Sequence, residues 1–252
     1  MDGPDPELLR EDMLDGVEHA LSRAPSAAVS DAMGAVPRHE FVAEAPYANR
    51  TGEQGGTRVL APATVVQFLD ALAAEPGDEV LVVGAGVGYT AAVVAEIVGA
   101  RRVHAVDITR SMVYEARQNL AAAGYDAVLV DRRDGSNGLP QYAPFGRVLV
   151  EAAAVSPPRA LLDQLADDGR LVMPRGQPGG QEIVAVEADG PTGWETVGTF
   201  GDVALRPLLV DGEQPDAPVR NRTEREDREF ERQGYFARTG WEQEWIDWER
   251  QD

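Results

Sequence analysis

Three acidic residues and a glycine-rich turn are the parts of this sequence whose types and spacing suit small-molecule chemistry. The turn follows an apolar run that ends at Val83, and its glycines are Gly84, Gly86 and Gly88. Later apolar runs lead to the three acids, which are Asp107, Asp134 and Glu151. Glycine lets a ligand approach the backbone closely, and a carboxylate accepts two hydroxyl hydrogen bonds at once. The pattern therefore predicts a nucleotide-type ligand whose ribose diol contacts Asp107.

The spacing of the glycines indicates which ligand the turn would bind. A strict dinucleotide motif would place its third glycine at position 89, where this chain has Tyr89. The observed G-x-G-x-G suits S-adenosylmethionine better, because that cofactor has no phosphate groups. Asp134 is then expected to accept from the adenine amino group. The predicted cofactor contacts are Val83, Gly84, Gly86, Gly88, Tyr89, Asp107, Ile108, Asp134, Gly135 and Glu151.

An alternation of strand and helix patterns must position these side chains. Apolar runs predict strands at 80–83, 102–107, 127–130, 145–150 and 169–174. Helical patterns fall at 6–23, 26–36, 64–74, 90–98, 111–123 (with Ser111 as N-cap) and 158–166, whereas 46–56 reads as loop. From 181 to 197 two strands flank Asp189-Gly190, which is typical of a hairpin. We expect an α/β fold with a mostly parallel sheet, an antiparallel edge hairpin and N-terminal helices.

Composition narrows the possible classes of protein. The 252 residues carry a formal net charge of −20, and all 23 basic residues are arginine. Acidic residues spread along the whole chain resemble those of proteins from salt-accumulating halophiles and argue against a nucleic-acid partner. No cysteine is present and the three histidines are scattered, so no metal site is expected. Without an apolar run of membrane length or a basic leader, we expect a soluble, cytoplasmic protein.

Several motifs together resemble the protein-L-isoaspartate (D-aspartate) O-methyltransferase family. They span about residues 29–209 and read AMGAVPRHEFV, LAPATVV, EPGDEVLVVGAGVGYTAAVVAEIVG, ARQNLAAAGY, DGSNGLPQYAPF, LVEAAA and DGRLVMPRG. The resemblance implies a Rossmann-like fold that binds S-adenosylmethionine. It also implies methylation of the α-carboxyl group of isoaspartyl or D-aspartyl residues in damaged proteins. The ester would then collapse to a succinimide, which reopens partly to aspartate.

This chain departs from the family pattern on the acceptor side. The family has a serine, regarded as its active-site residue, where this sequence has Leu60, and a leucine cannot donate a hydrogen bond. The family's acid before the glycine turn is Val82 here, and its threonine after the fourth strand is Glu151. The residues predicted to bind the acceptor are Thr57, Arg58 and Arg206, and either arginine could replace the lost hydroxyl by a bidentate contact.

The departures leave alternatives open. The chain could be a paralogue with another acceptor, such as a small molecule or a tRNA adenine, or a non-catalytic module that only binds the cofactor. An NAD-dependent dehydrogenase is disfavoured by Tyr89 and by the lack of a suitable histidine.

Three segments are predicted along the chain. Residues 1–62 carry N-terminal helices and a loop on the substrate side, residues 63–210 form the methyltransferase core, and 211–252 form an acidic linker and an aromatic helix. In that last helix Trp241, Trp245 and Trp248 would share one face. This face could pack on the core or support self-association.

Overall fold

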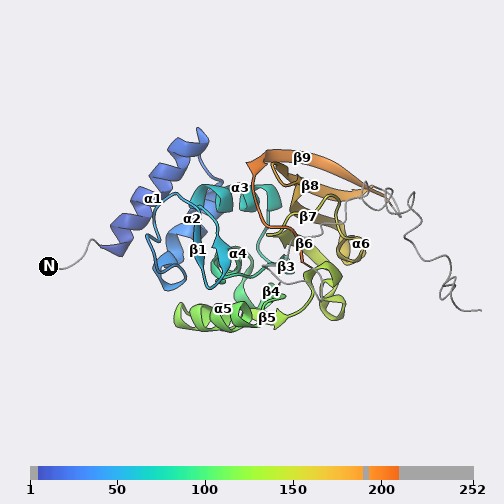
Figure 1. Cartoon of the computed structure of the whole chain (residues 1–252), viewed down its shortest axis with the longest axis horizontal. Coiled ribbons are helices and arrows are strands. Elements are labelled where there is room, and N and C mark those ends of the chain that lie inside the picture. Colours follow the sequence, from blue (N-terminus) through green and yellow to red (C-terminus); the bar gives the residue numbers. More distant parts are fainter. Residues whose placement is uncertain (1–4, 190–192, 210–252) are drawn as a thin grey trace, which may run out of the picture. The chain divides into compact units, whose positions relative to one another are not determined.

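A seven-stranded sheet organises the chain in the computed structural model, which describes residues 5–189 and 193–209 (Figure 1). Its strand order is β5-β4-β3-β6-β7-β8-β9, and β5 through β7 run parallel, whereas β8 and β9 continue the edge in antiparallel fashion. The strand bounds are β3 Val80–Val83, β4 Val103–Asp107, β5 Leu129–Arg132, β6 Phe145–Val150, β7 Leu165–Gln177, β8 Gly180–Asp189 and β9 Gly193–Val203. The predicted parallel sheet with an antiparallel edge is confirmed.

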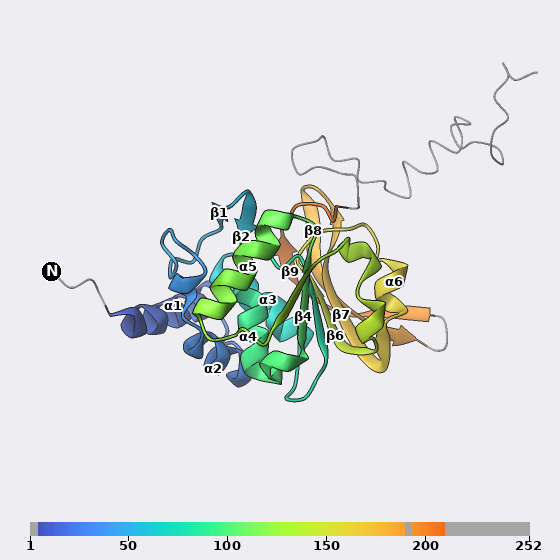
Figure 2. The same cartoon turned by 90° about the horizontal axis from the view of Figure 1, so that it is seen from below.

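Helices cover both faces of the sheet (Figure 2). Alternate residues of a strand point to opposite faces, so Val80 and Val82 of β3 pack in one core cluster and Leu81 and Val83 in another. The first cluster includes residues of α3 Pro62–Leu72, α4 Tyr89–Val98 and α5 Arg110–Ala122. The second is covered by α6 Arg159–Leu162 and by the loops around the short 3-10 turns η3 Gly135–Asn137 and η4 Pro140–Tyr142.

Two N-terminal helices extend the first core cluster. Helix α1 Pro6–Leu21 starts at Asp5, whose side chain accepts from the Glu7 N–H, and α2 Ala27–Ala35 starts in the same way at Ser26. Buried residues of both helices join the cluster on α3 and α4. The boundary predicted at residue 62 therefore separates two segments that share one hydrophobic core and belong to one compact unit.

One segment expected to be loop is a hairpin. Strands β1 Gly52–Gln54 and β2 Thr57–Val59 pair antiparallel across Gly55 and Gly56, whose φ angles are 59° and 82°. Two consecutive residues with positive φ form the turn that best matches the twist of paired strands. The Gly-Gly pair was thus a hairpin signal. It was missed because the whole segment is rich in glycine and was therefore interpreted as a loop.

Two further boundaries differ from the prediction. Helix α6 is only four residues long, because Leu165 already pairs with Phe145 as the start of β7. Helix α5 begins after Thr109, not Ser111, and has no side-chain cap. The Trp241, Trp245 and Trp248 face and the tip of the predicted hairpin at Gly190 lie outside the described residues. Among the helices that are described, none is long and apolar enough to cross a membrane.

Candidate functional site

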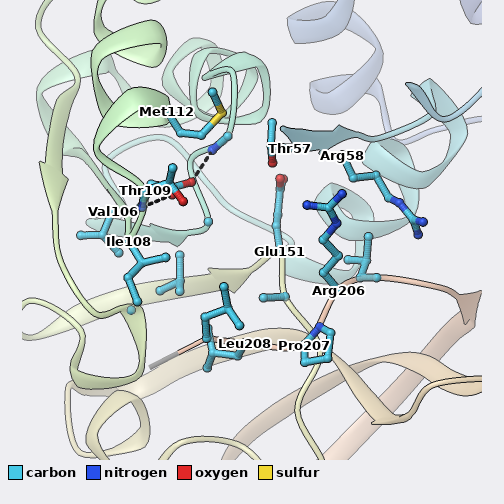
Figure 3. A pocket seen from close by; sticks show the side chains of 18 of the residues that line it. Thr57, Arg58, Val106, Ile108, Thr109, Met112, Glu151, Arg206, Pro207 and Leu208 are labelled. Atoms are coloured by element: carbon cyan, nitrogen blue, oxygen red, sulfur yellow. Dashed lines mark hydrogen bonds between the residues drawn. The ribbon is translucent and has the colours of Figure 1, made fainter. Parts of the chain in front are cut away.

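A cavity of about 250 Å³ lies at the carboxyl edge of the parallel strands (Figure 3). It is bounded by the ends of β3, β4 and β6, by the β1–β2 hairpin and by the segment after β9. Of the residues predicted from the sequence, it is lined by Thr57, Arg58, Leu60, Val83, Gly84, Gly86, Asp107, Ile108, Gly135, Glu151 and Arg206. Residues from both ends of the sequence thus meet at the edge where open α/β sheets bind ligands.

The glycine turn forms one wall of the cavity. The N–H groups of Gly84 and Ala85 both donate to the Val106 carbonyl, at 2.8 and 2.9 Å, which joins the turn to β4. Gly84 has a φ of 92°, which side chains rarely tolerate, and an added Cβ would lie 3.5 Å from Glu151 Cβ. Gly88 lies outside the cavity lining. It begins α4, and a Cβ there would lie 3.3 Å from Ala116 O on α5, so this glycine permits close packing of the helices.

Asp107 ends β4 with a carboxylate that is held by the backbone. Its Oδ2 accepts from the Gly86 N–H at 3.0 Å and its Oδ1 from the Thr109 N–H at 2.8 Å. Burial raises the pKa of Asp107, and the two backbone hydrogen bonds oppose that rise. A carboxylate has about four acceptor positions, and the Thr109 side chain also bonds to this one, so at least one position stays available to the hydroxyls of a ribose. The residue therefore fits the ribose contact expected of it.

An apolar slot adjoins Asp107. Val106, Ile108, Met112 and Leu208 line it, and Gly135 closes one side. A Cβ on Gly135 would lie 2.3 Å from Val83 Cγ1, so only glycine lets this loop approach β3 so closely. A flat apolar ring such as adenine suits this slot.

Besides Gly88, two residues predicted to contact the cofactor do not line this cavity. The Asp134 carboxylate accepts from the Ser136 N–H and hydroxyl, at 2.9 and 2.6 Å, and stabilises the η3 turn. Tyr89 instead lines a small chamber next to the cavity. Cofactor contacts by these two residues and by Gly88 stay predictions.

The opposite end of the cavity is rich in arginine. Arg206 donates to the Gly56 carbonyl at 2.7 Å and to Glu53 Oε1 at 2.9 Å, while Arg58 donates to the Ala204 carbonyl. These contacts join the β1–β2 hairpin to the segment after β9. Leu60 lines the same end and is 8% exposed.

Glu151 lines both the cavity and the small chamber. Burial raises the pKa of its carboxyl to about 7, and this rise is opposed by the Thr90 hydroxyl and by the Arg38 charge. In Figure 3 its side chain points toward Thr57 and away from Ile108.

Arg38 lies behind Glu151 and is only 2% exposed. It donates to the carbonyls of Pro46 and Leu60, at 2.7 and 2.5 Å, and its guanidinium lies 4.2 Å from the centre of the Tyr89 ring. These contacts fix the loop before β1 and the backbone at Leu60. Sequence reasoning missed this residue, because Arg38 stands next to His39 and Glu40 in a polar stretch that carries no signal of burial.

Sequence reasoning also missed the apolar lining residues Val106, Met112, Leu205, Pro207 and Leu208. Their types carry no chemical signal, and only the fold brings them to the cavity. No group of acidic or histidine side chains suited to a metal ion occurs within residues 5–189 and 193–209.

This fold and this cavity define a Rossmann-like methyltransferase. A solved structure from Plasmodium falciparum, described as a protein-L-isoaspartate O-methyltransferase in complex with S-adenosyl-L-homocysteine, shares the fold with a TM-score of 0.68. That match has 19% sequence identity and covers 82% of this chain and 99% of that one. At such identity the likeness supports the fold alone.

Sequence comparison specifies the family. The family profile of protein-L-isoaspartate (D-aspartate) O-methyltransferase matches residues 12–202. A protein-L-isoaspartate O-methyltransferase of Methylorubrum populi is 44% identical over 189 residues, covering 73% of this chain and 87% of the relative. One of Methanosarcina mazei is 37% identical over 209 residues, covering 81% and 84%. The chain belongs to the protein-L-isoaspartate (D-aspartate) O-methyltransferase family, and its cofactor is S-adenosylmethionine.

Proposed function

We propose that this chain methylates the α-carboxyl group of isoaspartyl residues in damaged proteins, and that Arg206 helps to bind that carboxylate. The observation that supports the proposal is a single cavity with two chemically different ends. One end presents the Asp107 carboxylate and an apolar slot, whereas the other presents two arginines. A cationic end suits an anionic acceptor, and the family match supports the isoaspartyl identity of that acceptor.

At the cofactor end, Asp107 would bind the ribose hydroxyls, and Ile108, Met112 and Leu208 would enclose the adenine ring. When bound, S-adenosylmethionine supplies an electrophilic methyl group on a sulfonium. The acceptor carboxylate is already ionised at neutral pH, so the protein needs no general base. Its residues have to place the acceptor in line with the methyl group and exclude water from both.

At the acceptor end, Arg206 is held by Glu53 before any acceptor binds. Both partners are partly exposed, with side-chain exposures of 44% and 70%, so the pair is weak and exchangeable. An incoming carboxylate would replace Glu53 on the guanidinium while the bond to the Gly56 carbonyl keeps the arginine oriented. This exchange gives Arg206 a role in an acceptor site whose Leu60 has no hydrogen-bond donor.

The proposed activity is tested with an isoaspartyl peptide and its aspartyl twin. Labelled S-adenosylmethionine should transfer its methyl group to the isoaspartyl peptide selectively, and S-adenosylhomocysteine binding is measured separately by calorimetry. Equal, background labelling of both peptides with cofactor binding intact would mean that the acceptor has changed. Background labelling without cofactor binding would contradict methyl transfer altogether.

High salt is the proposed working environment, and the cytoplasm the proposed compartment. The net charge of −20 is spread over the chain, so self-repulsion is screened only at high ionic strength. The assays above are therefore run in molar KCl. Self-association through residues 241–248 stays a prediction about a segment outside the described residues.

A further inference from the structure

Glu151 is a buried acid whose contacts within the protein do not explain its presence at the cavity. It follows β6, and its backbone N–H donates to the Val83 carbonyl at 2.8 Å, so the sheet fixes its position. Within the described residues, its Oε1 is enclosed and has no hydrogen-bond partner. A buried polar atom of this kind costs free energy unless a ligand or solvent satisfies it.

The groups around Glu151 bear on its charge. Arg38 and the Thr90 hydroxyl favour the ionised carboxylate, whereas burial and the negative charge of Asp107 favour the neutral acid. In the described part of the chain the enclosed Tyr89 hydroxyl likewise has no partner at hydrogen-bond geometry, and Tyr89 lines the same chamber. Burial raises the pKa of Tyr89, against the opposing influence of Arg38, so the hydroxyl stays neutral. Burial is the largest of these influences, and the carboxyl is therefore protonated over much of the acidic to neutral range.

Glu151 is placed where its neutral carboxyl group could contact the acceptor. Arg58, Leu60 and Gly86 line both the cavity and the chamber, as Glu151 does, so Glu151 lies where the glycine turn meets the Arg58 and Leu60 end. Arg206 also lines the cavity. An ionised Glu151 would repel an anionic acceptor there, whereas the neutral acid can donate an O–H hydrogen bond to it.

We infer that Glu151, in its neutral form, donates a hydrogen bond that holds the acceptor carboxylate at the Leu60 end of the cavity. This inference rests on the proposed function. The proton stays on Glu151 throughout, so the residue binds and orients the acceptor and takes no part in proton transfer. An acid would then supply the donor that Leu60 lacks, and acceptor binding would weaken as the pH rises.

The test compares wild type with E151Q, E151L and E195Q. Glutamine keeps a hydrogen-bond donor at position 151 but does not titrate, whereas leucine has no donor. Glu195 is an exposed glutamate on β9, and E195Q serves as the matched control. Two quantities are measured from pH 6 to pH 8 in molar KCl. One is kcat/KM for the isoaspartyl peptide, and the other is the Kd of that peptide for enzyme saturated with S-adenosylhomocysteine.

For wild type and E195Q, affinity and kcat/KM should fall about tenfold between pH 6 and pH 8, because the neutral fraction of an acid with a pKa of about 7 falls by that factor. E151Q should show a flat profile and exceed wild type at pH 8. E151L should bind the peptide about 10- to 100-fold more weakly than wild type at pH 6, with cofactor binding unchanged.

Two results would overturn the inference while leaving the proposed function intact. One is an E151Q profile that parallels wild type. The other is a wild-type affinity that rises with pH, together with weaker S-adenosylhomocysteine binding by E151Q, since an ionised Glu151 would then serve the cofactor's amino group. Wild type that labels isoaspartyl and aspartyl peptides equally would contradict the proposed function and this inference together.

Discussion

Replacing Arg206 by methionine should reduce acceptor binding with little effect on folding. R206M keeps an unbranched apolar stem like that of arginine but removes every donor of the guanidinium. A charge-assisted hydrogen bond contributes about 1.5–3 kcal/mol, so losing one of them should lower kcat/KM about 10- to 100-fold. Because the contact is made in the bound ground state as well, the loss should fall mainly on KM.

The structure also limits the cost of R206M to stability. The Arg206–Glu53 pair is largely exposed, so it contributes at most about 1 kcal/mol. The hydrogen bond to the Gly56 carbonyl adds about 1 kcal/mol more. Urea unfolding of R206M should therefore show a free energy lowered by no more than about 2 kcal/mol.

Two further variants sharpen the Arg206 test. R206K keeps the charge without the planar fork and should recover only part of the activity. E53Q removes the carboxylate that competes with the acceptor and should lower KM several-fold. The assay is methyl transfer to the isoaspartyl peptide at fixed salt. A kcat/KM for R206M within twofold of wild type, in folded protein, would refute the role assigned to Arg206.

Four other predictions concern the cofactor end, the buried charges and the surface. D107N should weaken S-adenosylhomocysteine binding about tenfold in calorimetry, since one charged acceptor is lost; an unchanged Kd would contradict the ribose contact. R38M should lower the unfolding free energy by about 3 kcal/mol, because it leaves two carbonyls unpaired; a loss below about 1 kcal/mol would contradict this. Since the pKa of Glu151 is raised from 4.5 to about 7 by folding, the stability of ligand-free wild type should fall as pH rises between these values, by up to about 3 kcal/mol. E151Q should lack this fall, and parallel stability curves would count against the raised pKa. The urea midpoint should rise between 0.1 and 2 M KCl, and a midpoint independent of salt would argue against self-repulsion as the main effect of the −20 charge.

The strands and most helices were predictable because their signals are local. The run Val80–Val83 is buried on both faces, and such strands are continuously apolar. The left-handed turn at Gly84 and the acid at Asp107 also follow from residue types close to each other in sequence. One error occurred where a distant partner decided the outcome. Leu165 extends β7 and shortens α6 because it pairs with Phe145, which is 20 residues earlier.

The sequence by itself determined the fold class, the cofactor and the family, since these depend on periodicity, on glycines with forced backbone angles and on contiguous motifs. Only the tertiary structure decided how the acceptor end is assembled. Arg206 meets Glu53 across 153 residues of sequence, and Arg38 is buried against the Leu60 carbonyl. The raised pKa of Glu151 likewise arises from burial by several elements. Charge, burial and hydrogen bonding at a site are properties of the neighbours that folding supplies, and no single segment of the chain encodes them.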